Sequence, residues 1–162
     1  MNVIAYFTLS ADGFLPRAED KDLPPPDPVI NDSLKRAAEA GSLIVGRTTY
    51  ESMEGEDQPV PVAIVSTSMK AEGDGVFVAD SPAKAVRLLE RKGISGALVG
   101  GGAKLFSSFL AAGLVDELYV NIAPELIGRG LRIEGPRRRA ETLKLVRTTR
   151  LDEGIVQLHY RR

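Results

Sequence analysis

Short, almost wholly apolar runs recur along the first two thirds of the chain, and each is followed by a segment with polar or helical character. Residues 43–45 (Leu-Ile-Val) and 97–99 (Ala-Leu-Val) have no polar position, and residues 3–9 and 60–65 are nearly as apolar. A strand without a polar face is typical of a sheet that helices cover on both sides. The pattern therefore predicts an α/β fold with a mostly parallel sheet.

Helical segments alternate with these strands and have recognisable ends. Ser81 and Pro82 form a typical helix start, because serine caps the first turn and proline is tolerated there. Gly41 and Gly113 each follow a run of helical spacing, as glycine commonly does at a helix end. We expect helices over residues 29–40, 46–53, 82–92 and 103–112.

The last part of the chain follows a different pattern. Residues 143–151 and 155–160 alternate apolar with polar side chains on either side of a short Asp-Glu-Gly turn, which predicts an antiparallel hairpin. Shorter strands are expected at residues 76–78 and 118–123. The chain thus predicts a three-layer α/β fold, with a mostly parallel central sheet and a C-terminal antiparallel hairpin. Since no repeat or linker divides it, we expect one domain over residues 1–162.

A proline-rich stretch at residues 16–28 interrupts this alternation. It is charged and ends Leu-Pro-Pro-Pro-Asp-Pro, and proline fixes φ and removes backbone donors. We expect an irregular loop, which is either functional or a simple surface excursion.

Composition excludes several kinds of site. The net charge is −1, so no large positive field favours nucleic acid or an anionic membrane; the arginines at 137–139 and 161–162 are local exceptions. There is no cysteine and only one histidine, His159, so we expect no metal centre. The N-terminus lacks the features of a signal peptide and no run approaches a membrane span, so we expect a cytoplasmic protein.

Three consecutive glycines, Gly100, Gly101 and Gly102, form the most informative segment, because they join an apolar strand to a helix that begins Ala103-Lys104. At the carboxyl end of a strand in an α/β sheet, glycines let backbone N–H groups approach an anion. The helix start adds its positive dipole. A pyrophosphate fits both features, although a tight turn alone also uses glycine. The spacing is not that of the Gly-x-Gly-x-x-Gly fingerprint.

Two further strand ends carry groups that suit phosphate. The first reads Gly46-Arg47-Thr48-Thr49, where an arginine fork and two hydroxyls follow an apolar strand. The threonines also suit simple helix capping. The second reads Ser66-Thr67-Ser68. Together with the glycine turn, these segments predict a site for an extended ligand with separated phosphates.

In sequence order, these three segments resemble the cofactor segments of dihydrofolate reductases. The fuller pattern is closest to the reductase domain of bacterial riboflavin-biosynthesis deaminase-reductases and their stand-alone relatives. Ser-Ala-Asp-Gly at residues 10–13, Leu-Val-Asp-Glu-Leu-Tyr-Val-Asn-Ile-Ala-Pro at 114–124 and Gly-Arg-Gly at 128–130 extend the likeness over nearly the whole chain. The fold expected is therefore dihydrofolate-reductase-like.

The resemblance implies NADPH as the hydride donor. It implies that Arg47 and residues 66–68 hold the 2′-phosphate end, and that Thr48 and residues 101–104 hold the pyrophosphate. It also implies a cis peptide bond between Gly100 and Gly101, and a homodimer.

Asp12 and Asp32 are the ionisable candidates for catalysis, by orienting a water that supplies the proton. Asp12 equally suits a turn, and Asp32 the first turn of a helix. Asn31 lies beside the position where dihydrofolate reductases place their pterin-binding acid, and Asn121 is a candidate for the opposite wall of the substrate site.

The expected function is transfer of hydride from NADPH to a small polar heterocyclic or sugar-linked substrate. Two departures leave the substrate open: the chain has no tryptophan, unlike the Pro-Trp pattern of folate enzymes, and the deaminase half is absent from these 162 residues. Two alternatives stand beside it. One is a nucleotide-binding protein of the same fold without turnover, and the other is a dihydrofolate reductase proper.

Overall fold

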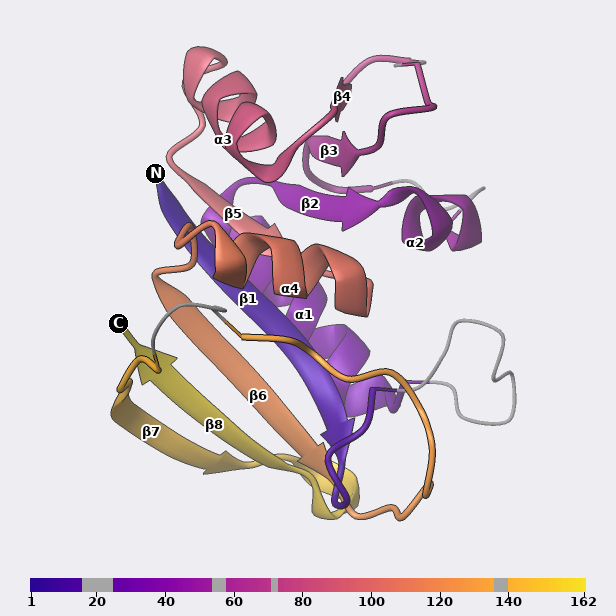
Figure 1. Cartoon of the computed structure of the whole chain (residues 1–162), viewed down its shortest axis with the longest axis vertical. Helices are drawn as coiled ribbons and strands as arrows, with labels where there is room; N and C mark the ends of the chain where they lie inside the picture. Colours follow the sequence, from indigo (N-terminus) through magenta and orange to yellow (C-terminus); the bar gives the residue numbers. More distant parts are fainter. Residues whose placement is uncertain (16–24, 54–57, 71–72, 136–139) are drawn as a thin grey trace.

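A single sheet runs through the computed structural model, which describes residues 1–15, 25–53, 58–70, 73–135 and 140–162. Within those residues, eight strands lie in the order β4-β3-β2-β5-β1-β6-β8-β7 (Figure 1). Their bounds are β1 (Asn2–Ser10), β2 (Leu43–Gly46), β3 (Val62–Val65), β4 (Val76–Ala79), β5 (Gly96–Val99), β6 (Glu117–Ala123), β7 (Lys144–Arg150) and β8 (Val156–Arg161).

The six strands from β4 to β6 pair in parallel, and the C-terminal hairpin of β7 and β8 adds an antiparallel edge. A short turn at Asp152–Gly154 joins the hairpin strands, with Glu153 at a φ of 58°. This arrangement confirms the predicted mostly parallel sheet with a C-terminal hairpin. Each predicted strand is present, and its bounds agree to within about two residues.

Four helices are described: α1 (Asp27–Ala40), α2 (Arg47–Ser52), α3 (Pro82–Arg91) and α4 (Ala103–Ala111). Figure 1 shows α4 in front of the sheet and α1 behind it. The apolar core is divided accordingly. Leu89 of α3 and Phe109 of α4 are fully buried on one face, and Val29 and Ala37 of α1 are buried on the other. These layers form the predicted three-layer fold.

The helix α1 begins earlier than predicted. Its first residue is Asp27, and Pro26 and Pro28 lie at its N-cap and in its first turn. Proline fits there because the first N–H groups of a helix have no partner within it. The expected irregular loop at residues 16–28 therefore ends sooner, and its residues 16–24 lie outside the described part of the chain, as do 137–139.

The start of β5 passes against the end of α1, which leaves no room for a side chain at Gly96. A Cβ atom built there lies 2.7 Å from the carbonyl oxygen of Ala40, a backbone atom that cannot turn away. We expect Gly96→Ala to lower the free energy of unfolding by about 1–3 kcal/mol, measured by urea denaturation.

The matched control for this substitution is Gly46→Ala. Gly46 has a φ of −82° and open space around its Cβ position, so its substitution should change the free energy of unfolding by less than about 0.5 kcal/mol. Equal stability of the Gly96 and Gly46 variants would contradict the close approach of α1 to β5.

Candidate functional site

The three segments predicted to suit phosphate follow neighbouring parallel strands. β2 lies between β3 and β5, with Gly46 opposite Val65 of β3 and Ile44 opposite Val99 of β5. The N–H of Gly100 donates to the carbonyl of Ile44 at 2.9 Å. Residues 46–49, 66–68 and 100–104 therefore lie along one edge of the sheet, at the carboxyl ends of the strands, where α/β folds bind ligands.

The glycine turn is packed tightly against α2. A Cβ atom on Gly101 would lie 2.6 Å from Cγ2 and 2.7 Å from Oγ1 of Thr49, and one on Gly100 would lie 2.8 Å from a methyl carbon of Leu43. A side chain at Gly101 would therefore collide with Thr49, whereas one at Gly100 would require the Leu43 side chain to move. The same closeness brings the turn after β5 and the first turn of α2 into direct contact.

Gly102 gives the turn its last distinctive feature. It has a φ of 82°, which side-chain-bearing residues rarely adopt, and it is the N-cap of α4. Ala103 is buried and Lys104 is exposed in the first helical turn, whose N–H groups have no acceptor within the helix. The donors and the exposed cation suit an anion. The prediction of a cis peptide between Gly100 and Gly101 is wrong in this structure, because the bond is trans.

Arg47 and Thr48 are exposed at the start of α2. The Nε atom of Arg47 lies 3.8 Å from a carboxylate oxygen of Glu51, and both side chains are about half exposed. An ion pair this long and this open is weak, so the guanidinium is available to a stronger anion. Directly after β3, the hydroxyl of Ser66 accepts the N–H groups of Ser68 and Met69 at 3.2 Å, which folds residues 66–68 into a compact turn.

Asp12 fastens the end of β1 to the loop that leaves β6. Its carboxylate accepts the hydroxyl of Ser10 at 2.6 Å and the N–H groups of Ile127 and Gly128 at 3.2 and 2.7 Å. The bond from Ser10, followed by those from the loop, holds the pKa of Asp12 below its usual value. Leu15 and Leu131 continue the same connection as an isolated bridge. Asp12 is therefore an ionised group that fixes the shape of this loop.

Asp32 is the centre of a polar network between α1 and the sheet. Its Oδ2 atom accepts the Nε–H of Arg36 and an amide N–H of Gln157, each at 2.8 Å. Burial opposes ionisation, but these two bonds outweigh it and leave the pKa of Asp32 below its usual value. Desolvation and the nearby Asp32 charge raise the pKa of Tyr6, which stays protonated and donates to the carbonyl of Val29.

The two asparagines occupy different environments. Asn121 is fully buried in β6, where its oxygen accepts from Gln157 at 2.9 Å and its NH₂ group lies 3.3 Å from the hydroxyl of Thr8. Its polar atoms are thus used inside the protein, so contact with a substrate would require one of these bonds to open. Asn31 is exposed on α1, one residue before Asp32.

Gln157 and Arg36 are the site residues that the sequence did not reveal. Gln157 is 2% exposed, donates to Asp32 and Asn121, and accepts an N–H of Arg36 at 3.0 Å. Arg36 also lies 3.7 Å above the ring of Tyr119, which stacks on His159 on its other side. The only available signal was the polar residue Gln157 at an inward position of a strand, and no motif surrounds it.

Among the residues that the structure describes, no cluster of three or more histidine or acidic side chains could hold a metal ion. None of the described helices is long and apolar enough to cross a membrane.

A family model described as the RibD C-terminal domain matches residues 1–157. Among curated proteins, the uncharacterized protein YyaP of Bacillus subtilis is 29% identical over 94 residues. That match covers 58% of this chain and 50% of YyaP, so it spans about half of the relative's length.

Solved structures share the fold over the whole described chain. A putative riboflavin biosynthesis protein from Shewanella sp. PV-4 has a TM-score of 0.78 at 22% identity, covering 100% of this chain and 99% of that one. A pyrimidine reductase-like protein from Corynebacterium diphtheriae has a TM-score of 0.77 at 15% identity, covering 99% of this chain and 91% of that one. A deaminase/reductase from Thermotoga maritima has a TM-score of 0.74 at 16% identity, covering 99% of this chain and 56% of that one. The predicted dihydrofolate-reductase-like fold is confirmed.

The contact between the glycine turn and α2 makes a testable prediction. Gly101→Ala should lower the free energy of unfolding by about 1–3 kcal/mol, because the new methyl group collides with Thr49. Adding Thr49→Ala removes the two atoms nearest to that methyl and should restore part of the loss in a urea titration. If the double variant recovers nothing beyond the sum of the single variants, the contact is not the cause.

The network at Asp32 predicts a dependence of stability on pH. Since folding lowers the pKa of this carboxyl, its ionised form stabilises the protein above the ordinary value of 3.8, and that contribution is lost as the pH falls through the lowered value. Asp32→Asn should therefore unfold more easily at pH 7, by about 1–3 kcal/mol, and the difference from the wild type should shrink by pH 3.

Urea titrations at the two pH values measure this difference, and Asp27→Asn, in the exposed first turn of the same helix, is the control. A deficit for Asp32→Asn that is equally large at pH 3 and pH 7 would mean that the charge of Asp32 is not what stabilises the network.

Proposed function

Because the chain belongs to the family of RibD C-terminal domains, we propose that it is an NADPH-dependent reductase of the riboflavin-pathway type. The observation that carries the proposal is the meeting of three phosphate-compatible segments at one edge of the parallel sheet. An extended ligand with two separated phosphate groups matches that edge, and NADPH is such a ligand.

The residues present fit this cofactor. Gly102 carries no side chain and leaves open space at the start of α4, where the first N–H groups of the helix have no acceptor within it. In the proposed arrangement Thr48, Thr49 and residues 100–104 hold the pyrophosphate, and Gly46, Arg47 and residues 66–68 hold the 2′-phosphate end. When bound, the cofactor supplies a hydride.

The protein's own part is to position the reactants and to hold charge. In this proposal Asp12 acts through the loop at residues 125–131, whose shape it fixes beside the end of β1. Asp32 remains an anion that orients a water molecule, and the water delivers the proton. Asn31 presents an exposed amide on the same helix, and Asn121 stiffens the wall from inside through Gln157.

The proposed substrate is a small polar heterocycle, with a sugar-linked pyrimidine as the first choice. The Thermotoga maritima relative is described as a reductase of 5-amino-6-(5-phosphoribosylamino)uracil, and the Corynebacterium diphtheriae relative as pyrimidine reductase-like. The homodimer, the small-molecule partner and the cytoplasmic location remain predictions.

One observation favours a second candidate, a protein that binds the nucleotide without turning over a substrate. Both candidate carboxyls have lowered pKa values, so neither is a direct proton donor near neutral pH. Consumption of NADPH in the presence of candidate pyrimidines, followed by its absorbance, separates the two functions, since a binding protein would leave the cofactor unchanged.

The proposal predicts that Arg47→Ala weakens the binding of NADPH more than the binding of NADH. Loss of a charge-assisted contact to the 2′-phosphate should weaken NADPH binding by about tenfold or more, whereas NADH has no such group. Calorimetric titration of the purified protein with both dinucleotides measures the difference. Lys35→Ala, which removes an exposed cation on α1, is the matched control. Equal losses for NADPH and NADH would contradict the role of Arg47, and no binding of either by the wild type would contradict the cofactor.

A further inference from the structure

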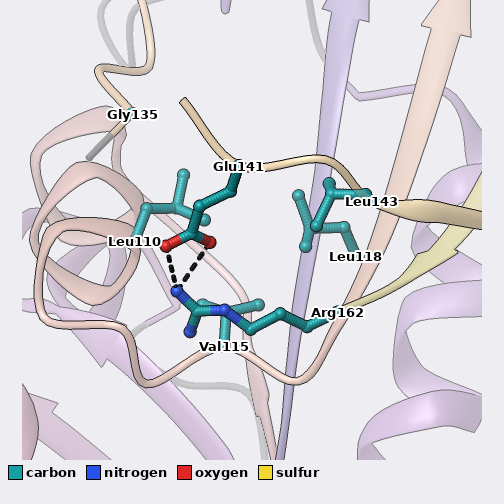
Figure 2. A pocket seen from close by; sticks show the side chains of 7 residues that line it. All are labelled: Leu110, Val115, Leu118, Gly135, Glu141, Leu143 and Arg162. Atoms are coloured by element: carbon teal, nitrogen blue, oxygen red, sulfur yellow. Dashed lines mark hydrogen bonds and ion pairs between the residues drawn. The ribbon is translucent and has the colours of Figure 1, made fainter. Parts of the chain in front are cut away.

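A small apolar cavity lies where β6 begins, beside the end of α4. Its volume is about 200 Å³, and the side chains of Leu110, Val115, Leu118 and Leu143 line it (Figure 2). Val115 and Leu118 are buried, so the floor of the cavity belongs to the core. The helix α4 starts at the glycine turn and ends beside the cavity. The cavity and the proposed cofactor site therefore lie at opposite ends of this helix.

An arginine is fixed at this cavity by a bond that does not depend on any carboxylate. Nη1 of Arg162 donates to the backbone carbonyl of Gly113 at 2.7 Å, just beyond the last turn of α4. The negative end of the helix dipole favours a cation there. The guanidinium is therefore already positioned for an anion.

The anion that it holds comes from the protein itself. Nη2 of Arg162 lies 2.5 and 2.6 Å from the two carboxylate oxygens of Glu141. Figure 2 shows this pair between Leu110 on one side and Leu118 and Leu143 on the other. Glu141 belongs to a stretch without helix or strand, and both side chains are more than a third exposed. Exposed pairs of this kind add little stability, so another carboxylate can compete for the arginine.

We propose that this cavity binds small apolar monocarboxylates, such as aryl or short aliphatic acids. The hydrocarbon part lies among the leucines and Val115, and the carboxylate replaces that of Glu141 on Arg162. The size is suitable, because this partly open cavity of about 200 Å³ is larger than an enclosed apolar cavity of about 150 Å³ that binds benzene in another protein. The arrangement combines an apolar body and one charged contact, as ligand sites commonly do.

Titration of the purified protein with benzoate, followed by ¹H–¹⁵N NMR, tests the proposal. We expect saturable shifts at residues around the cavity, with binding tightened about threefold to fivefold in Glu141→Ala, because the internal competitor is gone. Arg162→Ala should weaken the binding of benzoate about threefold to fivefold, because the carboxylate loses its exposed partner. Both variants alter exposed side chains, and their far-UV spectra would confirm that they remain folded.

Two further probes separate the contributions. Acetate should bind far more weakly than benzoate, because it leaves the cavity empty, and benzyl alcohol should bind weakly and respond to neither variant. Equal binding of benzoate to the wild type, Glu141→Ala and Arg162→Ala would overturn the proposal. So would benzyl alcohol binding as tightly as benzoate, which would indicate a purely apolar docking site. Displacement of benzoate by NADPH would mean that benzoate binds at the carboxyl ends of the strands, in the proposed cofactor site. That result would also overturn the proposal.

Discussion

The register of the parallel strands is the constraint on which the rest of the structure depends. Hydrogen bonds between β3, β2 and β5 align Gly46 with Val65 and set Gly100 against Ile44, so that the strands stop together. A slip of one residue would turn every side chain to the opposite face and separate the three segments. Because each strand is apolar on both faces, the two helical layers hold this alignment from both sides.

Most of the fold could be predicted from local sequence patterns, because a few neighbouring residues are enough to indicate a short apolar strand or the capped end of a helix. The place of the segments 46–49, 66–68 and 100–104 at one edge also followed, since parallel strands end on the same side. The sequence pattern predicts the start of α1 two residues late, because the proline-rich stretch up to Pro28 is typical of a loop, although proline is compatible with a first helical turn. The trans bond at Gly100 and Gly101 could not be read from a sequence, because glycine permits both forms.

The polar network around Asp32 could not be predicted for a different reason. Asp32 and Arg36 are one helical turn apart, but Gln157 joins them across 121 to 125 residues of sequence. Only the final pairing of β8 beside β6 brings its amide under α1. Likewise, Asp12 was identified as important, but its partners at residues 127 and 128 depend on how the loop after β6 returns to β1. Long-range polar contacts of this kind leave no local signal.

The amide of Gln157 has one further consequence, for how this family member can change over time. Its two donor bonds and its acceptor bond serve three residues on two other elements, and almost none of it is open to water. Replacing any one member of this network leaves a polar group of another member without its hydrogen bond, and water does not reach the buried amide to replace that bond. We therefore expect residues 32, 36, 121 and 157 to covary among related sequences. A substitution at one of these positions should be tolerated only in sequences that already carry compensating substitutions at the others.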